Sequence, residues 1–243
     1  MRKSSKNAGK SKLAVITGGS RGIGLAIARA FGGEGYQVII MGRDRRKLQA
    51  AVREFGDKES QTEIQVCDVT DPASVDTAFG EIKRHHKTID VLVNNAGIAH
   101  SLTEVGKLDP KIWKQVIETN LTGMFLVTRA ALPLMKAGGT IVNNLSVAAI
   151  HSFSGMAAYN ASKAGAMGFT NVLREELRER GIRVLALLPG ATDTDIWSQF
   201  WPNAPREKMV SPDTVAKAVL LAVSAPANTA IEEIRLGPAA GAL

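Results

Sequence analysis

The chain has 243 residues, enough for one large domain or at most two small ones. Hydrophobic residues make up 45% of the chain and charged residues 22%, as in soluble globular proteins. No apolar run reaches the roughly 18–20 residues that a membrane span requires, and no apolar segment follows the basic N-terminus to form a secretory signal. The single cysteine, Cys67, excludes an intrachain disulfide, so a cytoplasmic protein is the simplest expectation.

The net charge of +7 is concentrated at the N-terminus. Residues 1–12 contain no acid and five basic residues, namely Arg2, Lys3, Lys6, Lys10 and Lys12. The rest of the chain is therefore close to neutral, whereas a nucleic-acid-binding protein is expected to carry a basic patch on its folded domain. We predict a disordered basic tail over residues 1–12, a single folded domain over residues 13–243, and no nucleic-acid partner.

Apolar segments and helical segments alternate from residue 13 onward. Strands are expected at residues 13–17, 37–41, 63–67, 89–93, 140–145, 182–188 and 231–236. Helices are expected at residues 22–33, 45–55, from 72, 110–136, 157–179 and 212–224. This alternation predicts an α/β, Rossmann-type doubly wound fold, with a seven-stranded, mostly parallel sheet flanked by helices on both faces. Such sheets bind ligands at the carboxyl ends of their strands.

A glycine-rich loop follows the first expected strand and opens the first helix. Its sequence is Thr17-Gly18-Gly19-Ser20-Arg21-Gly22-Ile23-Gly24. Glycines let the backbone turn tightly and approach a pyrophosphate closely, and a helix N-terminus offers it free N–H groups. A purely structural turn is the alternative, but the strand before the loop and the helix after it favour dinucleotide binding.

The residues after the second expected strand bear on which dinucleotide is bound. An NAD site usually has a carboxylate there for the ribose hydroxyls, whereas this chain has Gly42-Arg43. Arg43 and Arg21 are candidates to clamp a 2′-phosphate, because guanidinium groups match phosphate geometry. Asp44 leaves NAD open as the alternative, since its carboxylate comes one residue later. The pattern favours NADP(H).

Two further strand ends carry candidate binding residues. Asp68-Val69 follows the third expected strand, where an acid can accept a hydrogen bond from an adenine amino group. A helix N-cap is the alternative function of Asp68. Asn94-Asn95-Ala96-Gly97 follows the fourth expected strand, where small residues leave room for a ligand, although alone it is an ordinary turn sequence.

Four polar residues form a candidate catalytic group. Tyr159 and Lys163 lie four residues apart at the start of an expected helix, so they project from one face. A tyrosine titrates near pH 10, at roughly the value of free phenols, and a nearby ammonium group lowers that pKa. Ser146 ends the fifth expected strand, where its hydroxyl can bind a developing oxyanion, and Asn120 lies in the preceding long helix. The group is typical of acid/base catalysis at a carbonyl oxygen.

In their order and spacing, these motifs resemble those of the short-chain dehydrogenase/reductase family, and in particular its NADP-preferring members that resemble 3-ketoacyl reductases. The resemblance covers roughly residues 12–236 and rests on Thr17–Gly24, Asn94–Gly97, Asn120, Ser146, Tyr159-Asn160-Ala161-Ser162-Lys163 and Pro189-Gly190. It implies that Tyr159 is the general acid in reduction and the base in oxidation. Lys163 would lower the pKa of Tyr159 and hold the nicotinamide ribose, Ser146 would orient the substrate oxygen, and Asn120 would position a proton-relaying water.

The resemblance also implies a set of cofactor contacts. They are Gly18, Ser20, Arg21, Gly22, Ile23 and Gly24 in the loop, Asp68 and Val69 at the adenine, Asn94, Ala96 and Gly97 on the ribose side, and Tyr159, Lys163, Pro189, Gly190, Thr192 and Thr194 toward the nicotinamide and diphosphate. Arg43 joins this set through the charge argument above. The sequence contains no His/Cys cluster of the kind that would suggest a metal site.

Two segments depart from, or vary within, the family pattern. The segment 196–210 corresponds to the variable substrate loop and contains Trp197, Phe200 and Trp201, which we expect either to cover an apolar substrate or to pack against the sheet or a neighbouring subunit. The ending Leu236–Leu243 lacks the longer glycine-rich form of fatty-acid-type ketoacyl reductases, so an acyl-carrier substrate is not expected. His151, Phe153 and Met156 are candidates to line the pocket, with His151 as a wall residue.

Three functions stay open on the sequence alone. The leading one is an NADP(H)-dependent oxidoreductase acting on a small carbonyl or secondary alcohol substrate. The others are an NAD-dependent alcohol or sugar dehydrogenase, against which Gly42-Arg43 argues, and a non-catalytic nucleotide sensor, against which the presence of both Tyr159 and Lys163 argues. The resemblance implies association through residues 110–136 and 157–179, with a homotetramer expected first and a dimer second.

Overall fold

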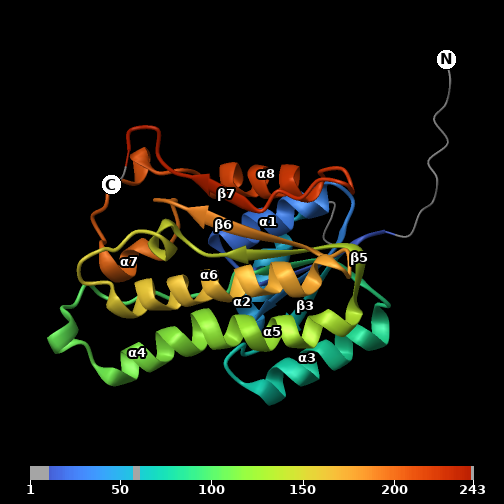
Figure 1. Cartoon of the computed structure of the whole chain (residues 1–243), viewed down its shortest axis with the longest axis horizontal. Coiled ribbons are helices and arrows are strands. Elements are labelled where there is room, and N and C mark those ends of the chain that lie inside the picture. The colour runs from blue at the N-terminus through green and yellow to red at the C-terminus, as the bar shows by residue number, and fades with distance from the viewer. Residues whose placement is uncertain (1–10, 57–60, 242–243) are drawn as a thin grey trace.

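The computed structural model describes residues 11–56 and 61–241, and Figure 1 shows their arrangement. The seven strands are β1 (Leu13–Thr17), β2 (Gln37–Gly42), β3 (Thr62–Val66), β4 (Ile89–Asn94), β5 (Met135–Asn144), β6 (Arg183–Pro189) and β7 (Glu233–Leu236). They form one sheet in the order β3-β2-β1-β4-β5-β6-β7, and every neighbouring pair is parallel. The predicted Rossmann-type fold is confirmed, and the strand order reverses beside β1, between β1 and β4.

Helices cover both faces of the sheet (Figure 1). One face packs against α1 (Gly22–Gly33), α2 (Arg45–Arg53) and α8 (Pro212–Val223), and the other against α3 (Pro72–His85), α5 (Gly123–Ala131) and α6 (Ala157–Arg178). Alternate residues of β1 feed the two cores: Ala14 and Ile16 lie in the first, and Leu13 and Val15 in the second. Because side chains alternate along a strand, an unbroken apolar run buries both faces of the sheet.

Short polar side chains and prolines set where the helices begin. Asp44, Asp71 and Ser211 cap α2, α3 and α8 by accepting hydrogen bonds from backbone N–H groups of the first turn. Proline follows the cap in α3 and α8, where its missing N–H costs no helical hydrogen bond. Asp71, rather than Asp68, is therefore the cap of α3.

The prediction of one helix over residues 110–136 was wrong. The structure has α4 (Pro110–Ile117), a π-helical turn at Glu118–Thr122, α5, and a 3₁₀ turn at Leu132–Leu134. Pro133 lacks the N–H that an α-helix would require there, so the helix tightens and ends. The strand β5 then starts at Met135, five residues before the expected Thr140, and the polar and glycine residues of 136–139 concealed its beginning.

The N-terminal tail could be compared with the structure only in part. Residues 1–10, which carry most of the expected disordered segment, lie outside the described residues. Residues 11 and 12 contact the domain: the Ser11 hydroxyl donates to the carbonyl of Gly35 at 2.8 Å, and the Lys12 ammonium lies 5.9 Å from the centre of the Tyr36 ring. None of the helices in the described part of the chain has the length and apolarity to cross a bilayer.

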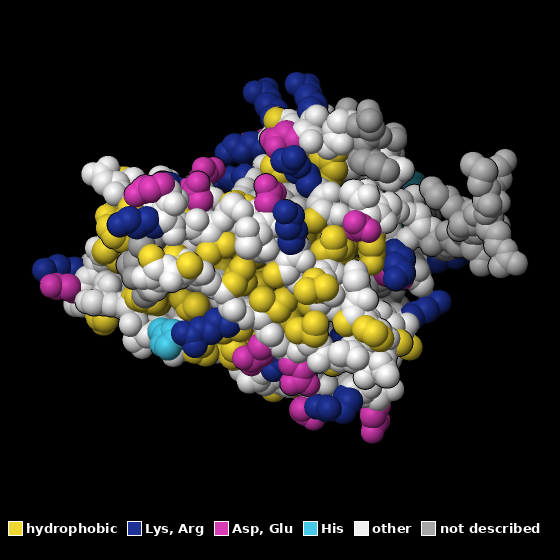
Figure 2. Space-filling model, turned by 90° about the horizontal axis from the view of Figure 1, so that it is seen from above, with side chains coloured by type: hydrophobic (Ala, Val, Ile, Leu, Met, Phe, Trp, Pro, Cys, Tyr) yellow, Lys and Arg dark blue, Asp and Glu magenta, His cyan; other side chains and the backbone are white. Residues whose placement is uncertain are grey.

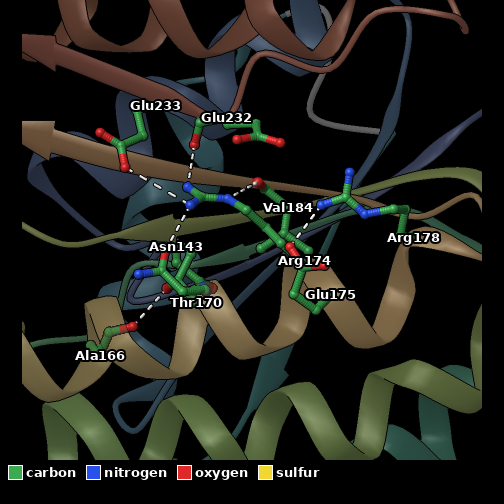
Figure 3. Close-up of polar contacts among 10 residues, drawn as sticks. Asn143, Ala166, Thr170, Arg174, Glu175, Arg178, Val184, Glu232 and Glu233 are labelled. Atoms are coloured by element: carbon green, nitrogen blue, oxygen red, sulfur yellow. Dashed lines mark hydrogen bonds and ion pairs between the residues drawn. The ribbon is translucent and has the colours of Figure 1, made fainter.

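Arg174 on α6 joins the two last strands of the sheet (Figure 3). Its side chain donates to the carbonyl oxygens of Val184 on β6 at 3.2 Å and of Glu232 just before β7, and it lies 3.8 Å from the Glu233 carboxylate. Only 12% of this side chain is exposed. Among the described residues, the exposed neighbour Arg178 forms an ion pair only with Glu175, one turn away on the same helix.

We predict that Arg174→Ala lowers the free energy of unfolding by about 1–3 kcal/mol, because buried carbonyl acceptors lose their donor. Arg178→Ala is the matched control, and its effect should stay within about 0.5 kcal/mol, since exposed ion pairs contribute little. Urea titration followed by circular dichroism measures both variants. Equal losses in the two variants would show that Arg174 does not hold β7.

Candidate active site

A cavity of about 1180 Å³ opens at the carboxyl ends of the strands. It is lined by residues that follow β1, β2, β3, β4, β5 and β6 and by residues at the end of β7. This is where a doubly wound sheet binds its ligands. The lining includes most of the residues selected from the sequence, namely Gly18, Ser20, Arg21, Gly22, Ile23, Arg43, Asp68, Val69, Ala96, Gly97, Ser146, Tyr159, Lys163, Pro189, Gly190, Thr192 and Thr194. Gly24, Asn94 and Asn120 lie behind the wall.

The glycine-rich loop forms a cradle that a side chain would fill. Gly18 and Gly22 have φ values of +63° and +55°, in the left-handed region that favours glycine. A Cβ atom at Gly18 would lie 2.9 Å from the amide nitrogen of Asn95, and one at Gly24 would lie 2.3 Å from it. At the start of α1, no side chain caps the free N–H groups and no acid lies in the first turn. The loop is therefore shaped and charged to receive a phosphate group.

Asn95 holds this loop, although the sequence had singled out its neighbour Asn94 instead. The side-chain amide of Asn95 donates to the carbonyls of Thr17 and Gly18 at 2.9 and 3.1 Å, and its oxygen accepts from Asn144 at 2.8 Å. Asn94 is buried, and its amide nitrogen donates to Thr128 and Asn143. Asn94 thus fixes the interior of the sheet, and Asn95 shapes the cavity.

The end of the cavity beside β2 is rich in cationic side chains. Arg43 and Lys47 both line it and are exposed. The Asp44 carboxylate also borders the cavity, but one of its oxygens accepts from the N–H groups of Arg46 and Lys47, at 2.9 and 3.2 Å, as the cap of α2. Lys47, which the sequence analysis did not select, adds a second cation next to Arg43. Lys47 follows Arg43 by four residues, and this spacing is the sequence signal that could have identified Lys47.

Arg21 and Asp68 both engage other parts of the chain. The guanidinium group of Arg21 lies 3.4 Å from the carboxylate of Asp195, so the expected pairing of Arg21 with Arg43 around one phosphate is not preformed. Asp68 accepts from the backbone and hydroxyl of Thr70 at 3.0 and 2.7 Å, and its own N–H donates to Ser74. These contacts fix the carboxylate of Asp68 at the cavity wall after β3.

Ser146, Tyr159 and Lys163 meet on one wall of the cavity. Ser146 caps a 3₁₀ turn at Val147–Ala149, and Tyr159 and Lys163 lie in the first two turns of α6. The Lys163 ammonium lies 5.6 Å from the centre of the Tyr159 ring and donates to the carbonyl of Asn144 at 2.9 Å. A hydroxyl donor, a phenol and an ammonium group thus surround one part of the cavity.

The protonation equilibria of these groups are shifted by burial. Burial raises the pKa of Tyr159, and hydrogen bonding to Ser146 acts in the opposite direction. Desolvation is the larger of the two effects on Tyr159. Burial also lowers the pKa of Lys163 to about 8, because the ammonium form loses hydration.

Asn120 lies in the π-helical turn and is almost completely buried. Its amide exchanges two hydrogen bonds with the backbone of Ile98, both at 2.9 Å, and donates to Ser162 at 3.0 Å. The Ser162 hydroxyl in turn donates to the carbonyl of Tyr159 at 2.7 Å. Asn120 therefore braces the start of α6 from behind, and a Cβ atom at Gly97 would lie only 3.3 Å from its amide oxygen.

Aromatic side chains form the wall beyond Thr192. Trp197, Phe200 and Trp201, in and directly after α7 (Trp197–Phe200), all line the cavity. The Trp197 indole N–H donates to the carbonyl of Thr192 at 2.8 Å. The centre of the Trp197 ring lies 4.6 Å from that of Phe200 and 6.1 Å from that of Trp201. These three rings therefore give this part of the cavity an aromatic, apolar wall.

Comparisons with known proteins agree with this geometry. The family model for short chain dehydrogenase matches residues 12–205. The chain belongs to the short-chain dehydrogenase/reductase family. It is 33% identical over 225 residues to a 3-oxoacyl-[acyl-carrier-protein] reductase of Chlamydia trachomatis, covering 88% of this chain and 90% of the relative. This short-chain dehydrogenase/reductase is an oxidoreductase, and the expected enzyme class is confirmed.

Solved structures show the same fold at similar identity. An alcohol dehydrogenase from Thermococcus sibiricus, complexed with 5-hydroxy-NADP, matches with a TM-score of 0.85 and 29% identity, over 95% of this chain and 97% of that one. A 3-ketoacyl-(acyl-carrier-protein) reductase from Brucella melitensis, complexed with NADH, matches with a TM-score of 0.86 and 28% identity, over 94% and 97%. A nicotinamide cofactor is thus common to these relatives, and both the phosphorylated and the unphosphorylated form occur among them.

The lowered pKa of Lys163 predicts how stability depends on pH. The folded protein releases the Lys163 proton near pH 8, whereas the unfolded chain releases it near 10.5. Between these values the unfolded chain binds more protons, so the free energy of unfolding rises with pH, by up to about 1.4 kcal/mol per unit. Below pH 8 Lys163 is protonated in both states, so the full cost of burying its charge lowers the free energy of unfolding.

Unfolding of the cofactor-free protein at pH 7.5 and pH 9.5 measures this effect, with Lys163→Met as the reference that lacks the group. Titrating groups away from Lys163, such as Cys67, contribute equally to both proteins and cancel in the difference. We expect the wild type to gain stability relative to Lys163→Met at the higher pH. A constant difference would mean that the pKa of Lys163 is unshifted.

Proposed function

We propose that this enzyme transfers hydride between NADP(H) and a small carbonyl or secondary alcohol substrate, with Tyr159 as general acid/base. The observation that carries the proposal is the position of Ser146, Tyr159 and Lys163 on one wall of the same cavity that holds the glycine cradle. A hydroxyl and a phenol within one wall can both reach a single carbonyl oxygen. A non-catalytic nucleotide sensor would have no use for this arrangement.

Three observations support a dinucleotide in the cavity. Gly18 and Gly22 form a cradle with no room for side chains, and the N–H groups at the start of α1 are uncapped. The amide oxygen of Asn144, which borders the cavity, is buried without a hydrogen-bond partner in the described structure and needs a donor from a ligand or a water. A bound nicotinamide would supply or accept the hydride.

Ser146, Tyr159 and Lys163 then have separate roles at the substrate oxygen. Ser146 holds the oxygen by donating a hydrogen bond, which strengthens as negative charge develops during reduction. Tyr159 delivers its phenolic proton to that oxygen, and takes a proton back when an alcohol is oxidised. Lys163 places positive charge beside the Tyr159 ring and opposes the loss of acidity that burial causes. Asn120 keeps the start of α6 in register behind them.

The charge at the β2 end supports NADP(H) over NAD. Arg43 makes no ion pair within the described residues, and Lys47 lines the same end of the cavity. The Asp44 carboxylate at this end of the cavity uses one of its oxygens to cap α2. Two cations and an engaged carboxylate suit a 2′-phosphate better than a ribose hydroxyl pair.

We also propose a homotetramer, with a dimer as the second choice. Large apolar side chains are exposed on the helices for which association was expected, among them Trp113 on α4, Phe125 on α5 and Val172 on α6. Figure 2 shows a second face, seen from above, where hydrophobic side chains gather at the centre and charged ones lie around them. A further exposed apolar side chain, Leu221, lies on α8. A tetramer of paired dimers needs two such surfaces.

Removal of the Tyr159 hydroxyl tests the catalytic assignment. We expect Tyr159→Phe to lower kcat for ketone reduction with NADPH by about 10²- to 10⁴-fold, the range typical of a lost general acid. NADPH affinity should change little. Tyr36, the only other tyrosine, is buried away from the cavity, so Tyr36→Phe is the matched control. Stopped-flow absorbance at the nicotinamide band gives the rates, and full activity in Tyr159→Phe would exclude Tyr159 as the acid.

Removal of the Arg43 guanidinium tests the cofactor assignment. We expect Arg43→Ala to weaken NADPH binding by about ten- to a hundredfold and NADH binding by less than about twofold, because only the 2′-phosphate loses a charge-assisted hydrogen bond. Arg46→Ala on α2, three residues further along the chain and outside the cavity lining, is the control. Fluorescence titration measures both cofactors. Tighter binding of NADH than NADPH by the wild type would favour the NAD-dependent alternative and assign Asp44 to the ribose.

A further inference from the structure

Arg235 lies at the substrate end of the cavity and has no part in the chemistry described above. It lies on β7, whose residues Ile234 and Leu236 pack against the core beneath α1 and α8. Strand alternation therefore places Arg235 and Glu233 on the opposite face, the face of α6, where Glu233 approaches Arg174. Because β7 is parallel to the other strands, its carboxyl end brings Arg235 to the same edge as Ser146.

The guanidinium group is held there by a neutral partner. An Arg235 nitrogen lies 2.7 Å from Nε2 of His151, and since guanidinium can only donate, the His151 nitrogen accepts. The backbone of His151 is fixed in turn: its N–H donates to Val147, next to Ser146, and its carbonyl accepts from the side chain of Asn160, next to Tyr159. Arg235 is thus oriented by the segment that carries Ser146 and Tyr159.

The positive charge of Arg235 is not neutralised by the chain. Within residues 11–56 and 61–241, no carboxylate oxygen lies at ion-pair distance from Arg235. The acids of the loop after β6 are already engaged, Asp193 with Arg206 at 2.6 Å and Asp195 with Arg21 at 3.4 Å. An arginine with free donors at the rim of a cavity can form a planar, two-point contact with a carboxylate.

The expected 2′-phosphate site beside Arg43 lies far from Arg235. Strand β7 is five positions from β2 in the sheet order, which at about 4.8 Å per strand separates Arg235 from Arg43 by roughly 24 Å. The contact with His151 instead holds Arg235 beside the segment that follows Ser146. An anion bound there lies on the side of Ser146 and Tyr159, where a substrate would bind.

We propose that Arg235 is a specificity-determining residue that binds a carboxylate on the substrate, so that this enzyme acts on oxo acids or the corresponding hydroxy acids. The inference rests on the proposed function. The aromatic wall of Trp197, Phe200 and Trp201 lines the same cavity and suits an apolar body between the reacting carbonyl and the carboxylate. Hydride and proton transfer take place at the carbonyl, and the carboxylate is unchanged in the reaction.

Matched acid and ester substrates test this inference. The wild type, Arg235→Gln, Arg235→Lys and Arg53→Gln are assayed with NADPH on 3-benzoylpropanoate, on homologues with longer methylene chains, and on the methyl ester of each compound. Arg53 is an exposed arginine on α2 outside the cavity, so Arg53→Gln controls for the loss of one positive charge. The quantity compared is the ratio of kcat/KM for each acid to that for its ester.

We expect the wild type to prefer at least one acid over its ester, and Arg235→Gln to lower that ratio by about tenfold through KM, the effect of one charge-assisted contact at an exposed site. Turnover of the esters should be unchanged in Arg235→Gln, which shows that the variant is folded and catalytic. Arg235→Lys should recover part of the ratio, because it keeps the charge but loses the fork.

Two outcomes would overturn the inference while leaving the proposed function standing. One is equal use of acid and ester by the wild type, and the other is a ratio that falls as much in Arg53→Gln as in Arg235→Gln. Failure of the wild type to oxidise NADPH with any acid or ester would instead count against the proposed function itself.

Discussion

The side chain of Asn95 connects the two halves of the cavity. Its amide nitrogen holds the carbonyls of Thr17 and Gly18, and its oxygen accepts from Asn144, whose carbonyl receives the Lys163 ammonium. A single chain of hydrogen bonds thus runs from the glycine cradle to Lys163 at the start of α6. It crosses the sheet between β1 and β4, where the strand order reverses and the loops separate. The geometry of both ends depends on this one amide, because a shift of Asn95 would move the cradle and the acceptor of Lys163 together.

The same chain of hydrogen bonds explains how a lysine can be buried beside a phenol. An ammonium group loses its hydration when it is buried, and the lowered pKa of Lys163 reflects that cost. The Asn144 carbonyl offsets part of the cost with one hydrogen bond. Burial thus raises the pKa of Tyr159 and lowers that of Lys163, and a bound group that accepts a further hydrogen bond from the ammonium would raise the pKa of Lys163 again.

The sequence predicted those features that depend on local patterns. Short apolar or alternating segments located the seven strands, and the spacing of Tyr159 and Lys163 placed both on one face of α6. The end of the helix before β5 was missed, because its helical pattern continues through Pro133 and only tertiary packing decides that the chain then becomes a strand. A sequence motif could not predict which of Asn94 and Asn95 shapes the cavity, since the two identical residues differ only in which side of the strand end they occupy. Contacts between distant segments, such as Arg21 with Asp195 or Arg235 with His151, have no sequence signal at all.

The distribution of charge along the cavity ties cofactor choice to substrate choice. Cations stand at both ends, Arg43 and Lys47 after β2 and Arg235 on β7, while the acids nearest to them cap a helix or pair with other arginines. Such a cavity favours anionic groups at each end and leaves hydroxyl, phenol and ammonium groups to act between them. A dinucleotide phosphate at one end and a carboxylate at the other would then fix the reacting carbon from both sides. Because two anchors restrict the orientation of the reactants more than one does, the same charges that would select the ligands would also hold the carbonyl oxygen against Ser146 and Tyr159.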